Sequence, residues 1–302
     1  MVMRRFWMRF ACIWTTRTTF KEKEGIPIEK PIRPFFQWRG GKRNLLNKIR
    51  PYLPASFNSY YEPFLGGGAM LFDLAPRRAY INDVHPLIYQ AFADMQDGKA
   101  KEIKQEYLAL QAEYTALDTP ARKAKIKEYL ARLNARLRAA QDVTALFCFL
   151  TKNCFCARFT QKKNGSYLCS WGEFTAFDSD NFDRAADFLQ SADITISNGD
   201  YENALSTADA GDLVFLDPPY SRPKATTFIN YNADTFKDAA QERLAAVYRE
   251  LDARGVLLME TNYDTPETRR LYDGFEFIPI RNRTHIASSD NFEQVMIRNY
   301  TN

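Results

Sequence analysis

Residues 214–222 read VFLDPPYSR, an apolar run that ends on an acid, two prolines and a tyrosine. The run Leu213–Leu216 predicts a buried strand. Proline fixes φ and cannot donate a backbone hydrogen bond, so Pro218 and Pro219 end this strand and leave Asp217 at its carboxyl edge. In an open α/β sheet, ligands bind outside that edge. The stretch therefore predicts a fold class and a place for the site.

The segments on either side repeat the order of strand, turn and helix. Residues 59–75, SYYEPFLGGGAMLFDLA, are typical of a strand, a glycine turn and a helix, and residues 78–92, RAYINDVHPLIYQAF, begin with a second strand. An amphipathic helix is expected over residues 239–253. The strand pattern resumes at residues 193–205, 213–216, 255–263, 275–281 and 293–300. This order predicts a doubly wound α/β sheet.

A segment of different composition interrupts the sheet pattern. Residues 99–141 are rich in Ala, Leu, Lys, Glu and Arg at helical spacing. Thr119 is expected to cap a second helix that has Pro120 at its first position. Aromatic and basic residues follow, with a hairpin signal at Asn164–Gly165. We therefore expect a poorly ordered extension over residues 1–30, a main domain over residues 31–94 and 190–302, and an inserted lobe over residues 95–189.

Composition narrows the class of protein. The 302 residues are 45% hydrophobic, and Lys plus Arg total 41 against 37 for Asp plus Glu, a mild excess that does not by itself identify a nucleic-acid binder. Five cysteines without a CxxC pair, and only two histidines, favour neither a metal cluster nor a disulfide framework, so we expect a reducing cytosol. Arginines interrupt the apolar N-terminal runs, and no membrane span is expected.

The glycine turn in EPFLGGG, residues 62–68, would let a ligand approach the backbone and the N–H groups of a helix. Asp83 ends the next strand, where such folds hydrogen-bond a ribose. A plain tight turn and a capping Asp are the alternatives. In WRGGK, residues 38–42, the GxxxxGK[ST] spacing is absent, which argues against a nucleotide triphosphatase. Lys42 would suit a ligand carboxylate, whereas Trp38 is equally explained by core packing.

The tetrapeptide of residues 217–220 is the most specific signal. The Asp217 carboxylate and the adjacent proline-held carbonyl offer two acceptors in a rigid geometry, which suits an exocyclic amino group with two N–H donors. Tyr220 adds a flat face on which a base could stack. The alternative is a strand-to-loop turn with a capping Asp.

Together these motifs resemble the Dam-type, alpha-group DNA adenine N6-methyltransferase family. Its order FxxWxGGK, ExFxGxG, recognition insertion and DPPY is matched over most of residues 31–302. Further matches are Phe228, Tyr231, Phe236, residues 241–244 and the closing IRNY. The resemblance implies a Rossmann-like class I methyltransferase sheet with an inserted helical target-recognition domain. It also implies a methyl group transferred from S-adenosylmethionine to adenine N6 in duplex DNA.

The resemblance also implies roles for individual residues. Asp83 would hold the cofactor ribose, Lys42 would lie near the methionine carboxylate, and Asp200 near the cofactor adenine. The full implied cofactor set is Trp38, Lys42, Phe64, Gly66, Gly68, Asp83, Asp200 and Asp217. The implied catalytic set is Asp217, Pro218, Pro219 and Tyr220. Asp217 and the Pro218 carbonyl would accept from the amino group of a flipped adenine, Tyr220 would stack on it, and no metal is implied.

The segment that should recognise DNA departs from the family pattern CFNGLxRxNxxGxFNxPFG. Residues 154–172 keep its spacing, but Cys156 replaces the usual Asn and Thr160 the usual Arg. Basic residues among aromatics suit phosphates and base edges, and the expected DNA contacts are Arg158, Lys162, Lys163 and Asn164. A solvated basic loop is the alternative reading.

The expected partner is double-stranded DNA, with neither a membrane nor a metal. We expect a monomer in the cytoplasm of a bacterium, or of a bacterial host if a phage encodes the chain. A separate restriction endonuclease and the target sequence stay open. Two other functions stay open as well: methylation of RNA adenine, and DNA binding without catalysis by a protein of the same fold.

Overall fold

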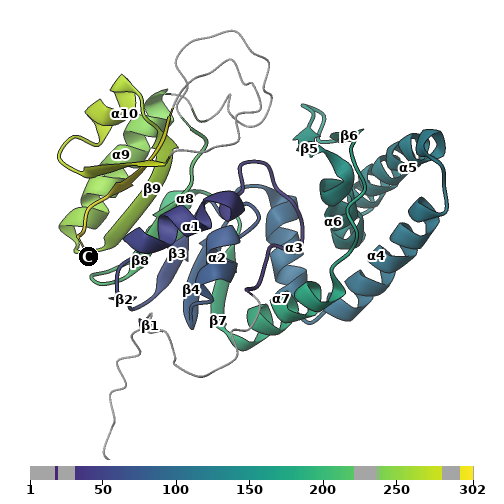
Figure 1. Ribbon diagram of the computed structural model, residues 1–302, viewed down its shortest axis with the longest axis horizontal. Helices are drawn as coiled ribbons and strands as arrows, with labels where there is room; N and C mark the ends of the chain where they lie inside the picture. Colours follow the sequence, from purple (N-terminus) through teal and green to yellow (C-terminus); the bar gives the residue numbers. More distant parts are fainter. Residues whose placement is uncertain (1–17, 20–30, 221–235, 237, 281–292, 302) are drawn as a thin grey trace, which may run out of the picture.

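The computed structural model describes residues 18–19, 31–220, 236, 238–280 and 293–301. Its centre is a seven-stranded sheet in the order β10-β11-β9-β8-β3-β4-β7 (Figure 1). The strands are β3 (Tyr60–Glu62), β4 (Arg78–Asn82), β7 (Asp193–Ser197), β8 (Leu213–Leu216), β9 (Leu257–Tyr263), β10 (Glu276–Ile280) and β11 (Gln294–Arg298). Only β11 runs antiparallel to its neighbours in this sheet. The predicted α/β class and mostly parallel sheet are confirmed.

The strand order reverses between β3 and β8. The chain adds β4 and β7 on one side of this pair and β9 on the other. β3 and β8 are parallel and in register, with Tyr60 opposite Leu213 and Tyr61 opposite Val214. Their carboxyl ends therefore lie next to each other, at the switch point where ligands bind in open α/β sheets.

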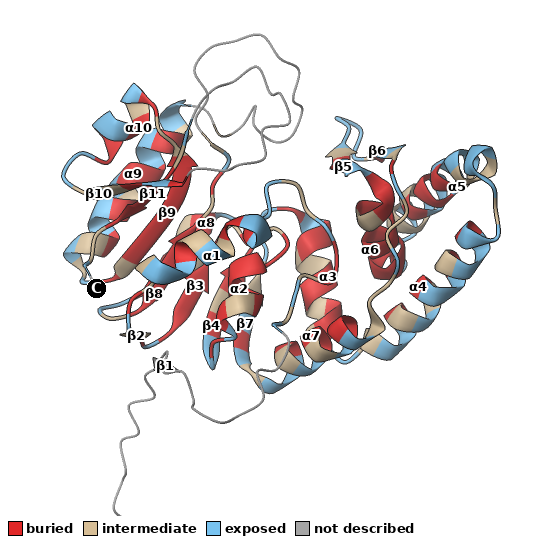
Figure 2. Cartoon of the chain, viewed as in Figure 1, coloured by how far each residue is buried: buried red, intermediate tan, exposed pale blue. Residues whose placement is uncertain are grey.

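Helices cover both faces of the sheet. Each face carries its own apolar cluster, because successive strand residues point to opposite faces. Leu213 and Phe215 of β8 belong to the first cluster, and Val214 and Leu216 belong to the second. All four β8 side chains are buried, as Figure 2 shows for the central strands. On the first face lie α2 (Ala69–Leu74), α3 (Pro86–Gln96) and α7 (Ser179–Ser191), and on the second α8 (Tyr201–Leu205), α9 (Asp238–Ala253) and α10 (Pro266–Leu271).

The predicted insertion forms a second lobe beside the sheet (Figure 1). It contains α4 (Ala100–Thr115), α5 (Thr119–Arg138), α6 (Thr144–Asn153) and the hairpin strands β5 (Cys154–Gln161) and β6 (Tyr167–Trp171). The expected turn at Asn164–Gly165 is confirmed, since the Gly165 N–H donates to the Lys162 carbonyl at 2.9 Å and Gly165 has a φ of +81°. The predicted domain limits stay predictions; α7, which precedes β7, packs against α3.

The cap of α5 differs from the sequence prediction. Asp118, not Thr119, is the N-cap, and its carboxylate accepts the Ala121 N–H at 2.9 Å. A short carboxylate one residue earlier captures the free N–H groups and adds a favourable charge at the positive end of the helix. Pro120 therefore stands at the second helical position.

Short elements precede the sheet: β1 (Thr18–Thr19), η1 (Lys42–Leu45), α1 (Leu46–Ile49), η2 (Arg50–Tyr52) and β2 (Ser56–Phe57). β1 pairs with β2, and the rest of the predicted extension over residues 1–30 lies outside the described residues. Within the described part of the chain, no helix is long and apolar enough to span a bilayer. The same residues contain no cluster of three His, Cys, Asp or Glu side chains suited to a metal ion.

Candidate functional site

Asp217 and Lys42 meet at the switch point. Lys42, in η1, forms an ion pair with Asp217 Oδ1, and its ammonium also donates to the Gly40 carbonyl at 2.9 Å. The Lys42 ammonium lies 5.0 Å from the centre of the Tyr220 ring. Lys42 is only 6% exposed. Its cation is therefore largely shielded from solvent, beside the two predicted acceptors, the Asp217 carboxylate and the Pro218 carbonyl.

The charge of Lys42 is maintained by its neighbours. Burial alone lowers the pKa of this amine, but Asp217 and Tyr220 together raise the pKa well above the usual lysine value. Lys42 is therefore charged at neutral pH. Its ammonium pairs with the Oδ1 oxygen of Asp217.

Asp217 is also held from the neighbouring strand. Thr261, on β9, donates its hydroxyl to Asp217 Oδ1 at 2.8 Å. The Tyr220 ring packs edge-on against Tyr263, with ring centres 4.8 Å apart and an interplanar angle of 77°. Burial raises the pKa of Tyr220 to about 12, so its hydroxyl is neutral at physiological pH.

Two further carboxyl groups lie close to this corner. Glu62, at the end of β3, accepts the Tyr60 hydroxyl at 2.9 Å and the Leu71 N–H at 3.0 Å, and burial raises its pKa to about 8. Glu260, on β9, is fully buried, and burial likewise raises its pKa to about 8. The sequence prediction used Glu62 only as part of a motif and passed over Glu260 and Thr261. Both residues belong to the polar run of residues 260–262 inside the otherwise apolar strand β9, and this run was the sequence feature that could have revealed them.

Asp83 and the glycine turn are joined directly. One Asp83 oxygen accepts the Gly66 N–H and the other accepts the His85 N–H, each at 2.8 Å. Gly66 has a φ of +53°, and a Cβ there would lie 3.2 Å from the Trp38 ring. Burial raises the pKa of Asp83 to about 6. The predicted ribose acid and the predicted glycine turn therefore form one structural unit, with Trp38 packed on it.

Packing also explains why the third residue of the turn, Gly68, is a glycine. Gly68 has a φ of +68°, and a Cβ at this position would lie 2.9 Å from the Phe92 ring. A side chain would therefore be strained in its backbone and would displace a core phenylalanine. Gly68 allows α2 to begin directly behind the turn.

An aromatic group lies on the other side of the turn. The Phe64 ring lies 5.1 Å from that of Tyr201 and 5.8 Å from that of Phe236, measured between ring centres. Asp200, the N-cap of α8, accepts the Glu202 N–H at 2.9 Å, and it pairs with Arg243 through contacts of 2.9 and 3.0 Å. The structure thus places the predicted Phe64 and Asp200 around one cluster. Phe228 and Tyr231 lie outside the described residues.

The predicted DNA contacts lie on the β5–β6 hairpin of the second lobe. Arg158, Lys162, Lys163 and Asn164 are all exposed. The turn is ordered by Asn164, whose side-chain Oδ1 accepts the Ser166 N–H at 3.1 Å and the Ser166 hydroxyl at 2.7 Å. The hairpin thus presents basic groups on a defined backbone.

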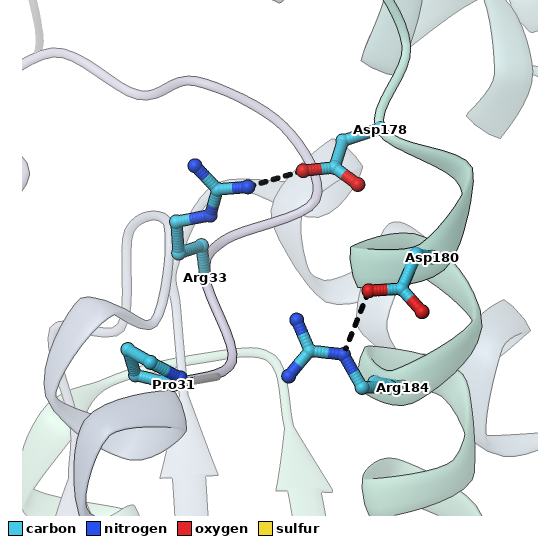
Figure 3. Close-up of a pocket in the computed structure, with 5 residues that line it drawn as sticks. All are labelled: Pro31, Arg33, Asp178, Asp180 and Arg184. Carbon is cyan, nitrogen blue, oxygen red and sulfur yellow. Dashed lines mark hydrogen bonds and ion pairs between the residues drawn. The ribbon is translucent and has the colours of Figure 1, made fainter. Parts of the chain in front are cut away.

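A cavity of about 550 Å³ lies elsewhere, at the start of α7 (Figure 3). Across it, Arg33 pairs with Asp178, and Arg184 lies 3.4 Å from Asp180. It contains none of the predicted site residues, and its charged groups pair with each other. It is therefore a salt-bridged junction between the chain entering the sheet and α7.

Comparison with known proteins gives consistent matches. A family model described as D12 class N6 adenine-specific DNA methyltransferase matches residues 38–286. A Type II methyltransferase of Lactococcus lactis subsp. cremoris is 32% identical, over 90% of this chain and 96% of its own length. A Type II methyltransferase of Methanocaldococcus jannaschii is 30% identical over 89% of this chain and 99% of its own. A DNA adenine methylase of Haemophilus influenzae is 25% identical, over 89% of this chain and 92% of its own.

Proposed function

Because the chain belongs to the D12 class N6 adenine-specific DNA methyltransferase family, we propose that its sheet-edge site transfers a methyl group from S-adenosylmethionine to adenine N6 in duplex DNA. One observation carries the assignment to this site: Asp217, Pro218, Pro219 and Tyr220 follow β8 at the strand switch point, beside the glycine turn and Asp83. The reaction needs an acceptor pair and a cofactor pocket together, and this arrangement supports both.

The residues around the glycine turn fit the proposed cofactor. Each Asp83 oxygen accepts one N–H and keeps a further lone pair, which suits the two hydroxyls of a ribose. The Phe64, Tyr201 and Phe236 rings offer faces for an adenine, and Asp200 an acceptor for its amino group. Lys42 would pair with the methionine carboxylate. When bound, S-adenosylmethionine supplies an electrophilic methyl group.

Asp217 and the Pro218 carbonyl would orient the target amino group. Each accepts one N–H, which turns the nitrogen lone pair toward the reacting methyl group and increases electron density on nitrogen. Thr261 and the Lys42 ammonium hold the carboxylate in place through its Oδ1. The rate then comes from positioning and electrostatics, and Tyr220 provides the face on which the base stacks.

The target base must leave the duplex to reach this corner, because its amino group is paired inside the helix. The exposed basic side chains of the β5–β6 hairpin, Arg158, Lys162 and Lys163, and the amide of Asn164 would hold the DNA through phosphates and base edges. We expect the protein to act as a monomer in the cytoplasm of a bacterium or of a phage-infected host.

Incubation with labelled S-adenosylmethionine and unmethylated duplex DNA, followed by nucleoside analysis, tests the proposal. The expected product is N6-methyladenine, and DNA that is already fully methylated should accept no label. Label that enters RNA adenine but not duplex DNA would favour an RNA methyltransferase instead. A folded protein that binds DNA and cofactor but transfers no label would favour the non-catalytic alternative.

A further inference from the structure

A buried amide lies directly behind the two prolines. Gln241, on α9, donates its side-chain N–H to the Pro219 carbonyl at 2.8 Å, and Gln241 is only 1% exposed. This bond joins the helix that covers the sheet to the loop that carries the acceptor pair. A buried amide that contacts a loop carbonyl restrains that peptide far more than a solvated one would.

The orientation of the Gln241 amide is fixed by the next strand. Asn262 Nδ2 donates to Gln241 Oε1 at 3.3 Å and to Glu260 Oε1 at 3.0 Å, and Asn262 and Glu260 are fully buried. If the Gln241 amide were reversed, its N–H groups would face those of Asn262, and its oxygen would face the Pro219 carbonyl. Asn262 Oδ1 accepts the Tyr263 N–H at 2.9 Å, so the chain Asn262, Gln241, Pro219 permits one arrangement.

Side chains from both faces of β9 thus restrain the segment of residues 217–219. Thr261 points one way and donates to Asp217 at 2.8 Å. Its neighbour Asn262 points the other way and acts on Pro219 through Gln241. The pyrrolidine rings already fix φ at Pro218 and Pro219, so the ψ angles are the main freedom left to this segment.

We propose that Gln241, oriented by Asn262, is a positioning residue for methyl transfer. By holding the Pro219 carbonyl, it fixes the peptide that leads into Tyr220 and, through the two rigid rings, the direction of the Pro218 carbonyl. The inference rests on the proposed function of this site. It implies that α9 and β9, and not only residues 217–220, determine the geometry of the acceptors.

Two substitutions of Gln241 test this role. Gln241→Glu keeps the shape but turns the donor into an acceptor that faces the Pro219 carbonyl, and Gln241→Met removes the donor without adding charge. For both, we expect the single-turnover rate of methyl transfer, per cofactor-bound protein, to fall about 10- to 100-fold. The dissociation constant for S-adenosylmethionine should stay within about twofold of the unmodified value, because the side-chain bonds of Gln241 go to Pro219 and Asn262 and not to the proposed cofactor residues.

Gln96→Glu is the matched control. Gln96, at the end of α3, also donates its side-chain N–H to a backbone carbonyl, that of Ile194 at 2.7 Å, on the far side of the sheet. We expect this variant to transfer methyl groups at the unmodified rate. Gln96 is half-buried, so this variant controls for loss of a glutamine-to-carbonyl bond, and the uncharged Gln241→Met controls for the charge that Gln241→Glu would bury.

The outcomes separate the inference from the function on which it rests. A Gln241→Met rate within twofold of the unmodified protein overturns the inference, as does a loss explained entirely by a smaller folded fraction in thermal melts. A slow variant that melts normally and binds cofactor normally supports it. An unmodified protein that makes no N6-methyladenine overturns the proposed function, and the inference with it.

Discussion

The sheet-edge site and the β5–β6 hairpin are both expected to contact DNA, but they are built in opposite ways. At the sheet edge, Asp217 receives bonds from Lys42 and Thr261, and most of the groups around it are buried. On the hairpin, the expected contact groups, including Lys162 and Lys163, are exposed. In the proposed function, buried groups would therefore fix the reaction geometry, whereas solvent-exposed side chains would recognise the DNA.

The hairpin nevertheless has a well-packed buried side. The Phe159 and Tyr167 rings stack with centres 5.0 Å apart at 20°, which anchors the strands on their buried side. Cys156 and Ala157 have φ values of 52° and 50°, unusual for residues with a Cβ, at the irregularity between Cys154 and Phe159. The difference between the two regions lies in their side chains, which are mostly buried and hydrogen-bonded at the sheet edge and exposed on the hairpin.

The largest difference between the regions should come from Asp217→Ala. Loss of the carboxylate removes one of two acceptors for the target amino group, and we expect kcat to fall by about 1,000-fold. Binding of duplex DNA in a mobility-shift assay should change little, since the hairpin is intact. A variant that loses DNA binding and methylation together would show that the site and the hairpin are not separable in this way.

Replacement of Lys42 should reveal how much the buried ion pair contributes to the free energy of unfolding. Lys42→Met removes the cation from a mostly buried pair and leaves the Asp217 carboxylate uncompensated, so we expect the free energy of unfolding to fall by about 3 kcal/mol. The control is Lys104→Met, which breaks the solvated pair with Asp183 and should cost under about 1 kcal/mol. Urea denaturation measures both. Equal losses in the two variants would contradict a special role for the buried pair.

The arrangement of strand end and glycine turn at the sheet edge could be predicted from the sequence because its signals are local. The apolar run before Asp217 and the two prolines predict a strand end, and the glycines at 66–68 with Asp83 predict a turn beside it. The parallel order of the strands then brings them together, as the structure shows. The helix over residues 239–253 and the Asn164–Gly165 turn were predicted for the same reason, and the structure contains both.

What the sequence could not predict depends on distant partners. Gln241 and Asn262 look like ordinary polar residues in a helix and a strand, and their role becomes visible only when the fold places them behind Pro219. The pairing of Lys42 with Asp217 likewise joins residues far apart in the sequence, and the predicted contact of Lys42 with a ligand carboxylate stays a prediction. The cap of α5 was misplaced by one residue, because Asp118 and Thr119 are both good caps and only backbone geometry decides between them.

A pH series should reveal the raised pKa of Asp83, the residue proposed to bind the ribose of the cofactor. The pKa of Asp83 is raised from 3.8 to about 6, so its carboxylate becomes fully ionised only near neutral pH. Ribose hydroxyls donate to the ionised form, and we expect affinity for S-adenosylmethionine to rise about tenfold from pH 5 to pH 7. The contribution of Asp83 to the stability of the ligand-free protein has the opposite sign: it is present below pH 3.8 and lost as the pH rises through 6.

Calorimetric titration at several pH values measures this affinity, and Asp83→Asn is the control. The asparagine cannot ionise, so its weaker binding should be nearly independent of pH over the same range. A dependence that persists unchanged in Asp83→Asn would assign the titration to another group.

The smallest effects should come from the hairpin. Lys162→Gln and Lys163→Gln each remove one cation that is expected to neutralise a phosphate, so we expect several-fold weaker DNA binding and, in each variant, a salt slope lower by about 1. The single-turnover rate at saturating DNA should not change, since both residues lie on the hairpin and not at the sheet edge. Lys127→Gln, on α5, is the control for a general decrease in positive charge. If the hairpin variants bind DNA with the salt slope of this control, the hairpin is a solvated loop and the contrast between the two regions is wrong.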